Sequence, residues 1–559
     1  MTDFTATRGT ELRCKNWRAE ALLRLLENVL EVGERPEDLV IYASIGKAAK
    51  NWEAYHQIVD ALKNIEENQT LLLQTGRPVA VMNTHTAAPM VLSAVNNTVG
   101  VWATEEKFYE RFKEGKTIWG GLTAAAWQYI GRQGVLGGTY ELLQAALFKH
   151  FDEQVAPHRW MLTAGMGGMG SSQPISAKML EISSLTVEAN QAKIDKLHAA
   201  GGLDVVAKDV DEALELVQRA VAEKKPTAVG LLGNAAEVFS AVVARGVVPD
   251  IVTDQTAAHD ARFGYLPAGY TLEQWDQTRE SNPEQVDADA RASMAEQVRA
   301  MVALAKAGSI VFENGNNLRV QASYVLSPEE SEEAFRTVPG FMEAYLRPLF
   351  SRGIGPFRWM ILSGSEQDQK VVDDLAANMF PERPEIARWI ELARAEIPNQ
   401  GLPARTCWLG YGERAQLALA VNDAVATGEI SAPVAFSRDH LDSAGMTHPR
   451  IGTEGMKDDS DGVTDWPILD LMLLATAGAD MVAVHSGGGG YSGWMQSAGV
   501  TVVADGTVEA AARLRQAFDF DSGLGVIRHA TAGYEEALDE VESSHRDGSV
   551  KAPLNHIRN

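Results

Sequence analysis

The residues best suited to chemistry in this chain are three glycines, Gly165, Gly167 and Gly170, spaced as G-x-G-x-x-G. The apolar run over residues 159–164 predicts a strand before them, and residues 174–184 predict a helix after them. Such a turn offers free backbone N–H groups and a favourable helix dipole to a pyrophosphate. The pattern favours a dinucleotide site, although glycines also mark tight turns that bind nothing.

An acidic residue strengthens the dinucleotide interpretation. Glu188 lies near the end of the next predicted strand, residues 185–190. A carboxylate at this point of a strand–helix–strand unit of about 30 residues binds ribose hydroxyls. Because it would repel a phosphate on the ribose, the acid favours NAD over NADP.

Cysteine and histidine usage argues against a metal centre. The chain has only two cysteines, Cys14 and Cys407, which give neither a disulfide framework nor a four-thiolate metal site. The spacing of His440, His448 and His485 fits no zinc pattern. We therefore expect no metal, and we expect acid–base chemistry from an uncharged histidine or a nearby aspartate.

The elements around the glycine loop alternate between strand and helix. A strand over residues 227–233, a helix over 234–246 and a strand over 250–255 continue the alternation, which predicts a parallel, doubly wound sheet. We assign residues 131–340 to this Rossmann-like domain. Residues 1–130 and 341–559 read as the two parts of a larger α/β core domain. They begin with an amphipathic helix over residues 11–31 and include a second glycine loop at 484–490.

Charge and hydropathy restrict the partners. With 50 basic and 75 acidic residues the net charge is −25, which disfavours nucleic acid and anionic membranes. The polar N-terminus shows no secretory signal. The most apolar stretch, residues 466–485, carries two aspartates and predicts a helix and a buried strand, not a membrane span. We expect a cytoplasmic protein that acts on a small molecule.

A series of distinctive segments, in order along nearly the whole chain, resembles one enzyme family. They are LVIYASIGKAAKNW, HTAAPMVL, LTAAAWQYIGRQGVLGGTYE, TAGMGGMGSSQP, GNAAEVF, DIVTDQTAAHD, GYLPAGYT, RPLFSRGIGPFRW, QGLPARTCWLGYGER, RDHLDS, MKDDSDGVTDWP and GVIRHATAGYE. These segments are similar to the urocanases, or urocanate hydratases. The runs GLPARTCWLG and RDHLDS are the most particular.

The resemblance implies a cytoplasmic homodimer with an α/β fold, in which a Rossmann-type NAD-binding domain is inserted in a larger α/β core. It implies tightly bound NAD⁺ that serves as an electrophile on an imidazole-acrylate. Water then adds to the ring and a proton to the side chain, giving an imidazolone-propionate without net redox.

The resemblance also carries cofactor contacts onto this chain. They are Ser44, Gly168, Met169, Gly170, Glu188, Asn234, Ala235, Gln255, Thr256, Ala257, Ala258, His259, Tyr265, Leu266, Asn314 and Gly489. Amide and hydroxyl groups suit the polar edges of a dinucleotide. From the residues alone, Asn234 could equally cap a helix and Gln255 form a turn.

Catalytic and substrate-binding residues carry over in the same way. The catalytic candidates are Cys407, Arg358, Tyr42, Asp439 and His440, and the substrate-binding candidates are His85, Thr123, Gly121, Arg450 and Ile451. Arg358 suits a substrate carboxylate, or else a structural ion pair. Cys407 would line the nicotinamide pocket, or else be a buried apolar residue.

The chain departs from the family pattern in several motifs. Ala43 and Ser44 replace two glycines, Gly121 a glutamine, Met90 an arginine, Asn314 a tyrosine, Ser486 a second histidine, and Ile451 an arginine, with Arg450 one place earlier. We interpret these changes as clustering around the substrate. Stripping the partner from a buried carboxylate costs about 2–5 kcal/mol, so a urocanase should not readily lose an arginine.

The departures suggest a paralogue that hydrates a ring-modified urocanate. S-methyl thiourocanate or thiourocanate, from the degradation of sulfur-bearing betaine histidines such as ergothioneine, is the preferred substrate, and an N-methylated urocanate is next. The alternative is an ordinary urocanate hydratase of histidine degradation in which Arg450 substitutes for the lost arginine. From other classes, an NAD-dependent oxidoreductase and a non-catalytic NAD-binding sensor remain.

Overall fold

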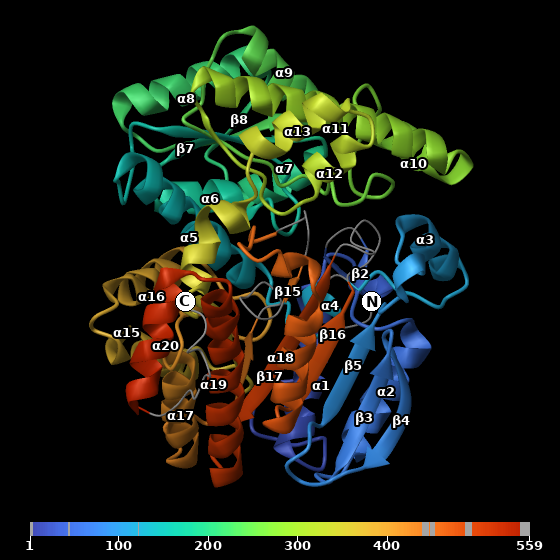
Figure 1. Cartoon of the computed structure of the whole chain (residues 1–559), viewed down its shortest axis with the longest axis vertical. Helices are drawn as coiled ribbons and strands as arrows, with labels where there is room; N and C mark the ends of the chain where they lie inside the picture. Colours follow the sequence, from blue (N-terminus) through green and yellow to red (C-terminus); the bar gives the residue numbers. More distant parts are fainter. Residues whose placement is uncertain are drawn as a thin grey trace. The chain divides into compact units, whose positions relative to one another are not determined.

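The computed structural model describes residues 4–42, 45–120, 122–438, 446–447, 453–486 and 495–547. The chain divides into two compact units (Figure 1). Unit 1 combines Met1–Gly137, Arg347–Pro449 and Gly455–Asn559, and unit 2 combines Gly138–Leu346 with Arg450–Glu454. Within the described chain, no helix has the length and apolar character needed to cross a membrane.

Unit 2 is built on a parallel sheet whose strand order is β11-β10-β6-β7-β9-β8. The strands are β6 (Trp160–Ala164), β7 (Ser183–Glu188), β8 (Val205–Ala207), β9 (Ala228–Leu232), β10 (Ile251–Val252) and β11 (Ile310–Val311). The helices are α6 (Ser172–Met179), α7 (Gln191–Ala199), α8 (Val210–Glu223), α9 (Ala235–Ala244), α10 (Leu272–Ser281), α11 (Pro283–Ala307), α12 (Leu318–Ser323) and α13 (Pro328–Thr337). The predicted parallel, doubly wound sheet is confirmed.

Helices cover both faces of this sheet. Residues of α8, α9 and α11 pack with Leu185, Val187 and Val229 into one large core. On the other face, a smaller core joins Ala228 to residues of α7 such as Ile194. Strands buried on both faces explain why the sequence reads as continuous apolar runs here.

The first helix after the glycine loop is shorter than predicted. Residues 174–184 were expected to be helical, but α6 ends at Met179 and β7 begins at Ser183. Glu181 adopts a left-handed conformation with φ of 57°, which stops the helix. Ser183 and Ser184 therefore belong to the buried strand.

Unit 1 contains a mixed sheet in the order β13-β12-β14-β17-β16-β5-β3-β4, with β15 paired to β17. The strands are β3 (Gln69–Gln74), β4 (Arg77–Asn83), β5 (Val91–Val95), β12 (Gly355–Ile361), β13 (Ala404–Leu409), β14 (Val434–Arg438), β15 (Met446–Thr447), β16 (Met481–His485) and β17 (Gln496–Ala504). A separate antiparallel pair joins β1 (Val40–Tyr42) to β2 (Gly46–Lys47). The parallel pair β5–β16 joins two parts of the chain, one that precedes residues 138–346 in the sequence and one that follows them.

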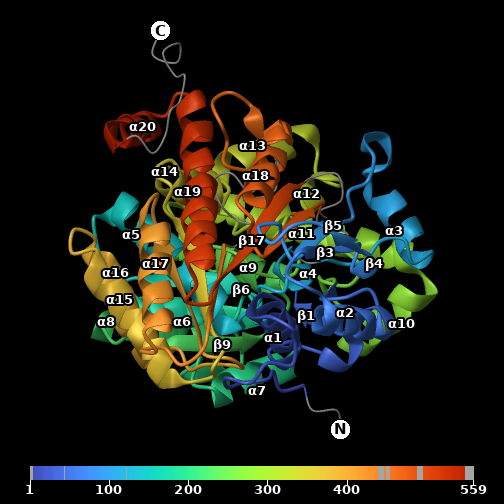
Figure 2. The same cartoon turned by 90° about the horizontal axis from the view of Figure 1, so that it is seen from below.

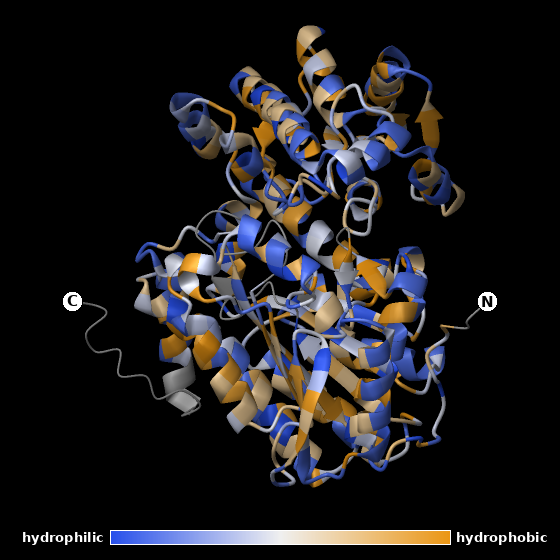
Figure 3. Ribbon diagram, turned by 90° about the vertical axis from the view of Figure 1, so that its right-hand side faces the viewer, coloured by the Kyte–Doolittle hydropathy of each residue, from blue (hydrophilic) through white to orange (hydrophobic). Residues whose placement is uncertain are grey.

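The helices of unit 1 enclose this sheet. They are α1 (Trp17–Glu31), α2 (Trp52–Asn64), α3 (Glu105–Lys113), α4 (Leu122–Ala125), α14 (Arg347–Phe350), α15 (Glu366–Met379), α16 (Pro384–Glu396), α17 (Glu413–Ala426), α18 (Asp465–Thr476), α19 (Val508–Thr531) and α20 (Glu535–Asp547). α17 and α19 run side by side (Figures 1 and 2). Figure 3 shows hydrophobic residues gathered along the strands that these helices flank.

Two helices begin in unit 1 close to boundaries that the sequence predicted, residue 11 for the first helix and residue 131 for the Rossmann-like domain. The first helix was expected from residue 11, but α1 begins at Trp17, where Asn16 caps it, and Leu12 is 45% exposed before it. Helix α5 (Arg132–Phe151) starts in unit 1 and continues into unit 2.

Candidate functional site

Two of the three fingerprint glycines are needed for a tight loop. Gly165 has a φ of +92°, and a Cβ there would lie 2.3 Å from the carbonyl oxygen of Gln255. A Cβ on Gly170 would lie 2.2 Å from the carbonyl oxygen of Gly165. The loop between β6 and α6 therefore folds back on itself and packs directly on the segment after β10, which only glycine permits.

The third glycine faces open space. A Cβ on Gly167 would meet only the Lys193 ammonium nitrogen, at 4.0 Å. In the described part of the chain, the amides of Gly167, Met169 and Gly170 donate to no acceptor. N–H groups without an acceptor, one of them on the glycine beside Lys193, form a cradle that suits a pyrophosphate. Lys193 was not predicted. The sequence does show it, however, in the first turn of the helix that follows Glu188.

Glu188 stands where an acid was predicted, at the last residue of β7. It is buried, and its two oxygens accept the amides of Met166 at 2.6 Å and Asn190 at 2.9 Å. Each carboxylate oxygen can accept a second hydrogen bond, so the group can still receive ribose hydroxyls. These features fit a dinucleotide whose ribose carries no phosphate.

The structural alternative for Asn234 is confirmed. Its Oδ1 caps α9 by accepting the amides of Ala236 at 3.0 Å and Glu237 at 3.4 Å. Its Nδ2 donates to the carbonyl oxygen of Leu266 at 2.9 Å. The side chain thus ties two predicted cofactor segments together.

Hydrogen bonds to other residues of unit 2 hold the segment that follows β10. Gln255 Nε2 donates to the carbonyl oxygen of Asn314 at 2.8 Å, Thr256 Oγ1 donates to Asp254 at 2.6 Å, and the Tyr265 hydroxyl donates to Gln297 at 2.8 Å. Of the other predicted cofactor residues in unit 2, Ala235, Ala258 and His259 are buried and Ala257 is partly buried. The hydroxyls of Thr256 and Tyr265 therefore position the segment rather than face outward.

In unit 1, Tyr42 and Thr123 come together. The amide of Thr123 donates to the Tyr42 hydroxyl oxygen at 3.2 Å. The Tyr42 ring stacks on Tyr129, with centroids 4.8 Å apart and planes within 3°. Burial raises the pKa of Tyr129 far above its usual range, so its hydroxyl stays protonated. Tyr129 was not predicted as a site residue.

Arg358 lies on the same side of unit 1 as Tyr129. It is buried on β12, and its Nη1 donates to the carbonyl oxygen of Gln128 at 2.8 Å. Its charge acts on Tyr129, where it opposes the rise in pKa. Helix α5 approaches closely because Gly134 and Gly137 lack side chains: a Cβ at these positions would lie 3.2 Å from the Arg358 guanidinium carbon and 2.4 Å from Thr406 Cγ2.

Cys407 does not share this location. On β13 it pairs with Phe357, whereas Thr406 pairs with Arg358. Since successive strand residues point to opposite faces, Cys407 and Arg358 leave the sheet on opposite sides. Phe357, on the Cys407 side, packs against Phe518 of α19 with ring centroids 4.8 Å apart. The apolar, buried interpretation of Cys407 therefore agrees with its surroundings.

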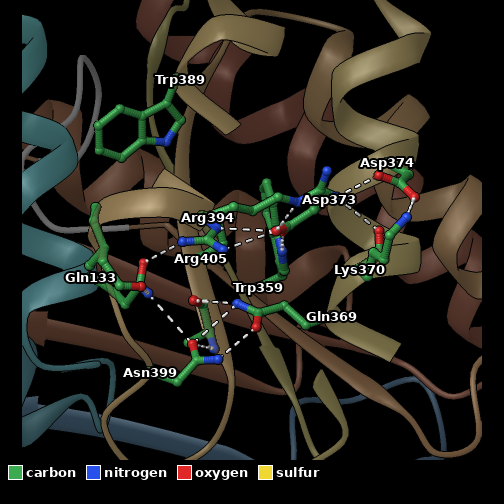
Figure 4. Close-up of polar contacts among 12 residues, drawn as sticks. Gln133, Trp359, Gln369, Lys370, Asp373, Asp374, Trp389, Arg394, Asn399 and Arg405 are labelled. Carbon is green, nitrogen blue, oxygen red and sulfur yellow. Dashed lines mark hydrogen bonds and ion pairs between the residues drawn. The ribbon is translucent and has the colours of Figure 1, made fainter. Parts of the chain in front are cut away.

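A buried polar network fixes the β12–β13 edge (Figure 4). Arg405 pairs with Asp373 at 3.0 Å and donates to Gln133 Oε1 at 3.0 Å. The Trp359 indole donates to Asp373 at 3.0 Å. Because Gln133 lies in the first turn of α5, the network holds that helix against the strands that carry Arg358 and Cys407.

His485 ends β16 and is fully buried. Burial lowers its pKa to about 3, so the imidazole is neutral. A Cβ on Gly120 would lie 3.7 Å from its Nδ1. Two departures from the family pattern adjoin this contact in sequence: Gly121 follows Gly120, and Ser486 follows His485.

The structure does not place His85 and Met90 with these residues. β5 runs parallel to β16, so its first residue, Val91, is roughly 13 Å from Val95, the partner of His485. His85 is exposed before β5, and the buried Met90 immediately precedes it. Met90 therefore lies at the opposite end of β5 from Val95, and the interpretation that the departures surround the substrate stays a prediction.

Some predicted site residues lie outside the described residues. They are Ser44, Gly121, Asp439, His440, Arg450, Ile451 and Gly489.

Models of known protein families match the chain over nearly its whole length. The urocanase N-terminal domain matches residues 4–128, the urocanase Rossmann-like domain residues 131–345, and the urocanase C-terminal domain residues 348–543. The chain belongs to the urocanase family. Membership makes it a hydro-lyase for a urocanate-like small molecule and confirms the resemblance read from the sequence. The Rossmann-like match covers the parallel sheet of unit 2, which is consistent with nucleotide binding.

Proposed function

We propose that this urocanase-family enzyme uses NAD⁺ to hydrate a ring-modified urocanate, with S-methyl thiourocanate or thiourocanate preferred. The observation that carries the proposal is the Gly120–His485 contact, because the glutamine lost at Gly121 and the histidine lost at Ser486 are adjacent to it in sequence. Both changes replace a long side chain with a small one. Lost bulk beside a buried neutral imidazole leaves room for a ring substituent.

The chain's own groups have distinct tasks in this proposal. The buried Arg358 guanidinium binds the substrate carboxylate, a pairing that two parallel N–H···O bonds make specific. The Tyr42–Tyr129 stack orients the flat ring. Asp439 or His440 moves the proton of the attacking water.

The cradle of unit 2 is the proposed NAD⁺ site. The open amides at Gly167, Met169 and Gly170, with Lys193, would hold the pyrophosphate, and Glu188 would hold the ribose. Bound NAD⁺ would supply an electron-poor ring that makes the substrate imidazole susceptible to water. We propose a cytoplasmic homodimer, as the family resemblance implies.

A substrate panel tests the proposal. Urocanate, thiourocanate, S-methyl thiourocanate and N-methyl urocanates are compared by the loss of the acrylate chromophore. Ser486→His restores bulk beside His485 and should shift the ratio of kcat/KM toward plain urocanate. Met90→Leu, at the far end of β5, is the matched control and should leave that ratio unchanged. Fastest turnover of plain urocanate by the wild type would end the paralogue proposal.

Cofactor and reaction class need separate tests. Denaturing the purified enzyme should release NAD⁺ into the supernatant, and active enzyme without it would contradict the cofactor assignment. Growth of the reduced-nicotinamide absorbance with these substrates would show an oxidoreductase instead of a hydratase. Saturable binding without turnover would show a sensor.

A further inference from the structure

Asp254 is a buried carboxylate in unit 2 that neither the family resemblance nor the proposed function uses. It follows β10 and is fully inaccessible to solvent. Its Oδ1 accepts Gln297 Nε2 at 2.8 Å, and its Oδ2 accepts Thr256 Oγ1 at 2.6 Å. Asn316 Nδ2 donates to Oδ2 as well. In the described chain, no ion pair joins Asp254 to a lysine or arginine.

These donors belong to separate parts of the proposed cofactor site. Thr256 lies in the segment that packs on the glycine loop. Gln297, from α11, also accepts a hydrogen bond from the Tyr265 hydroxyl at 2.8 Å, so it links Tyr265 to Asp254. Asn316 also donates to the Thr256 carbonyl oxygen at 2.9 Å, and it lies two residues after Asn314. One carboxylate therefore joins the segments around residues 256, 265 and 314.

The ionised carboxylate accepts all of these hydrogen bonds without a proton of its own. It has two oxygens and no proton, whereas an amide or a carboxylic acid must present a donor to one neighbour. Two of the three neighbours, Gln297 and Asn316, already point N–H groups at it. An amide here would point an N–H group at the N–H group of Gln297 or Asn316, and protonation would turn the Thr256 hydroxyl from a donor into an acceptor, so either change weakens the cluster.

Charges near Asp254 do little to keep it ionised. Burial raises its pKa to about 6, against the effect of the hydrogen bonds from Thr256, Gln297 and Asn316. The titratable group linked to it is Tyr265, whose pKa is raised by burial and by the charge of Asp254, with Glu237 adding a smaller effect. The carboxylate thus loses its charge near pH 6, while its neighbours stay neutral.

We propose that Asp254 is a positioning residue that locks the three segments into the arrangement that retains NAD⁺. The inference rests on the proposed cofactor. Cofactor affinity then depends on a buried residue of the domain as well as on the residues that face the ligand.

Asp254→Asn tests this directly, with NAD⁺ dissociation as the readout. Holoenzyme is diluted into buffers on either side of pH 6, and released NAD⁺ is assayed in the filtrate over time. Loss of a buried hydrogen bond to a charged group predicts release about tenfold to hundredfold faster than from the wild type. Release should accelerate below pH 6 in the wild type and be independent of pH in the variant.

Asp289→Asn is the matched control. Asp289 also accepts a tyrosine hydroxyl, from Tyr270 at 2.7 Å, and a glutamine amide, from Gln285 at 2.9 Å, but it lies outside the Asp254 cluster. It should release NAD⁺ like the wild type at every pH. Gln297→Met, which cuts only the Tyr265 branch, should give a smaller acceleration and serves if Asp254→Asn does not fold.

The outcomes separate the two proposals. Wild-type retention and pH dependence in Asp254→Asn would overturn the role of Asp254 alone. If Asp254→Asn fails to fold, wild-type release from Gln297→Met would overturn it. Wild-type protein that neither carries NAD⁺ nor takes it up would overturn the cofactor proposal and this inference together.

Discussion

The contact between α5 and β13 gives a sharp prediction. A Cβ on Gly137 would lie 2.4 Å from Thr406 Cγ2 and 3.3 Å from Trp389 Cζ2, where ordinary contact begins at 3.4 Å. Thr406 is fully buried, so its methyl group has little free space to move into. Overpacking of this kind costs about 1–3 kcal/mol, and alanine regains about 1 kcal/mol of helix propensity. Gly137→Ala should therefore lower the free energy of unfolding of unit 1 by up to about 2 kcal/mol.

The neighbouring glycine is the natural control. A Cβ on Gly138 meets nothing within 4 Å, so Gly138→Ala should stabilise the helix by about 0.5–1 kcal/mol. The assay is urea denaturation followed by tryptophan fluorescence, since Trp359, Trp389 and Trp408 all lie in unit 1. Thr406→Ser in the Gly137→Ala background removes the clashing methyl group and should recover most of the lost stability.

The double-mutant cycle decides the interpretation. Thr406→Ser alone should cost about 1 kcal/mol for the lost buried methyl group. The double variant should then be more stable than the sum of the two single changes predicts, because the contact is shared. Additive effects, or equal effects of alanine at Gly137 and Gly138, would refute the close approach of α5 to β13.

Two further predictions concern the pH and the glycine loop. Burial lowers the pKa of His485 from 6.5 to about 3, so the neutral ring stabilises the fold above pH 6.5, and this stability is lost as the pH falls toward 3. His485→Gln should reduce the loss of unfolding free energy at falling pH by up to about 1.4 kcal/mol per pH unit, measured by urea denaturation, and an unchanged slope would contradict the buried position. Gly165→Ala places a Cβ 2.3 Å from the Gln255 carbonyl oxygen and should abolish NAD⁺ retention while circular dichroism stays native. A variant that kept its NAD⁺ would show that this loop is not the cofactor site.

The Rossmann-like unit was largely predictable because its signals are local. Its strands are buried on both faces, so each appears as an apolar run, and Gly165 and Gly170 mark a loop that tolerates no side chain. The short strand β8, with Val205 and Val206 only partly buried, lacked such a signal and was not predicted. The end of α6 was missed because a left-handed Glu181 has no distinctive sequence.

The arrangement of the site residues in unit 1 could not be predicted, because it depends on pairing between strands that are distant in the sequence. The family motifs identified Arg358 and Cys407, but only the strand register shows that they point to opposite faces. His85 was grouped with Thr123 by motif, whereas the direction of β5 separates them. Tyr129 lies in the family motif LTAAAWQYIGRQGVLGGTYE but was not singled out, because the sequence does not reveal that it stacks on Tyr42.

The split of unit 1 across the chain has a consequence for biosynthesis. β5 pairs with β16, which leaves the ribosome hundreds of residues later, whereas the sheet of unit 2 comes from one uninterrupted stretch. Unit 2 can therefore fold first, while the nascent β5 waits with an open, apolar edge that invites aggregation. Expression of the first half of the chain alone should then give insoluble protein, because nothing pairs with this edge of β5.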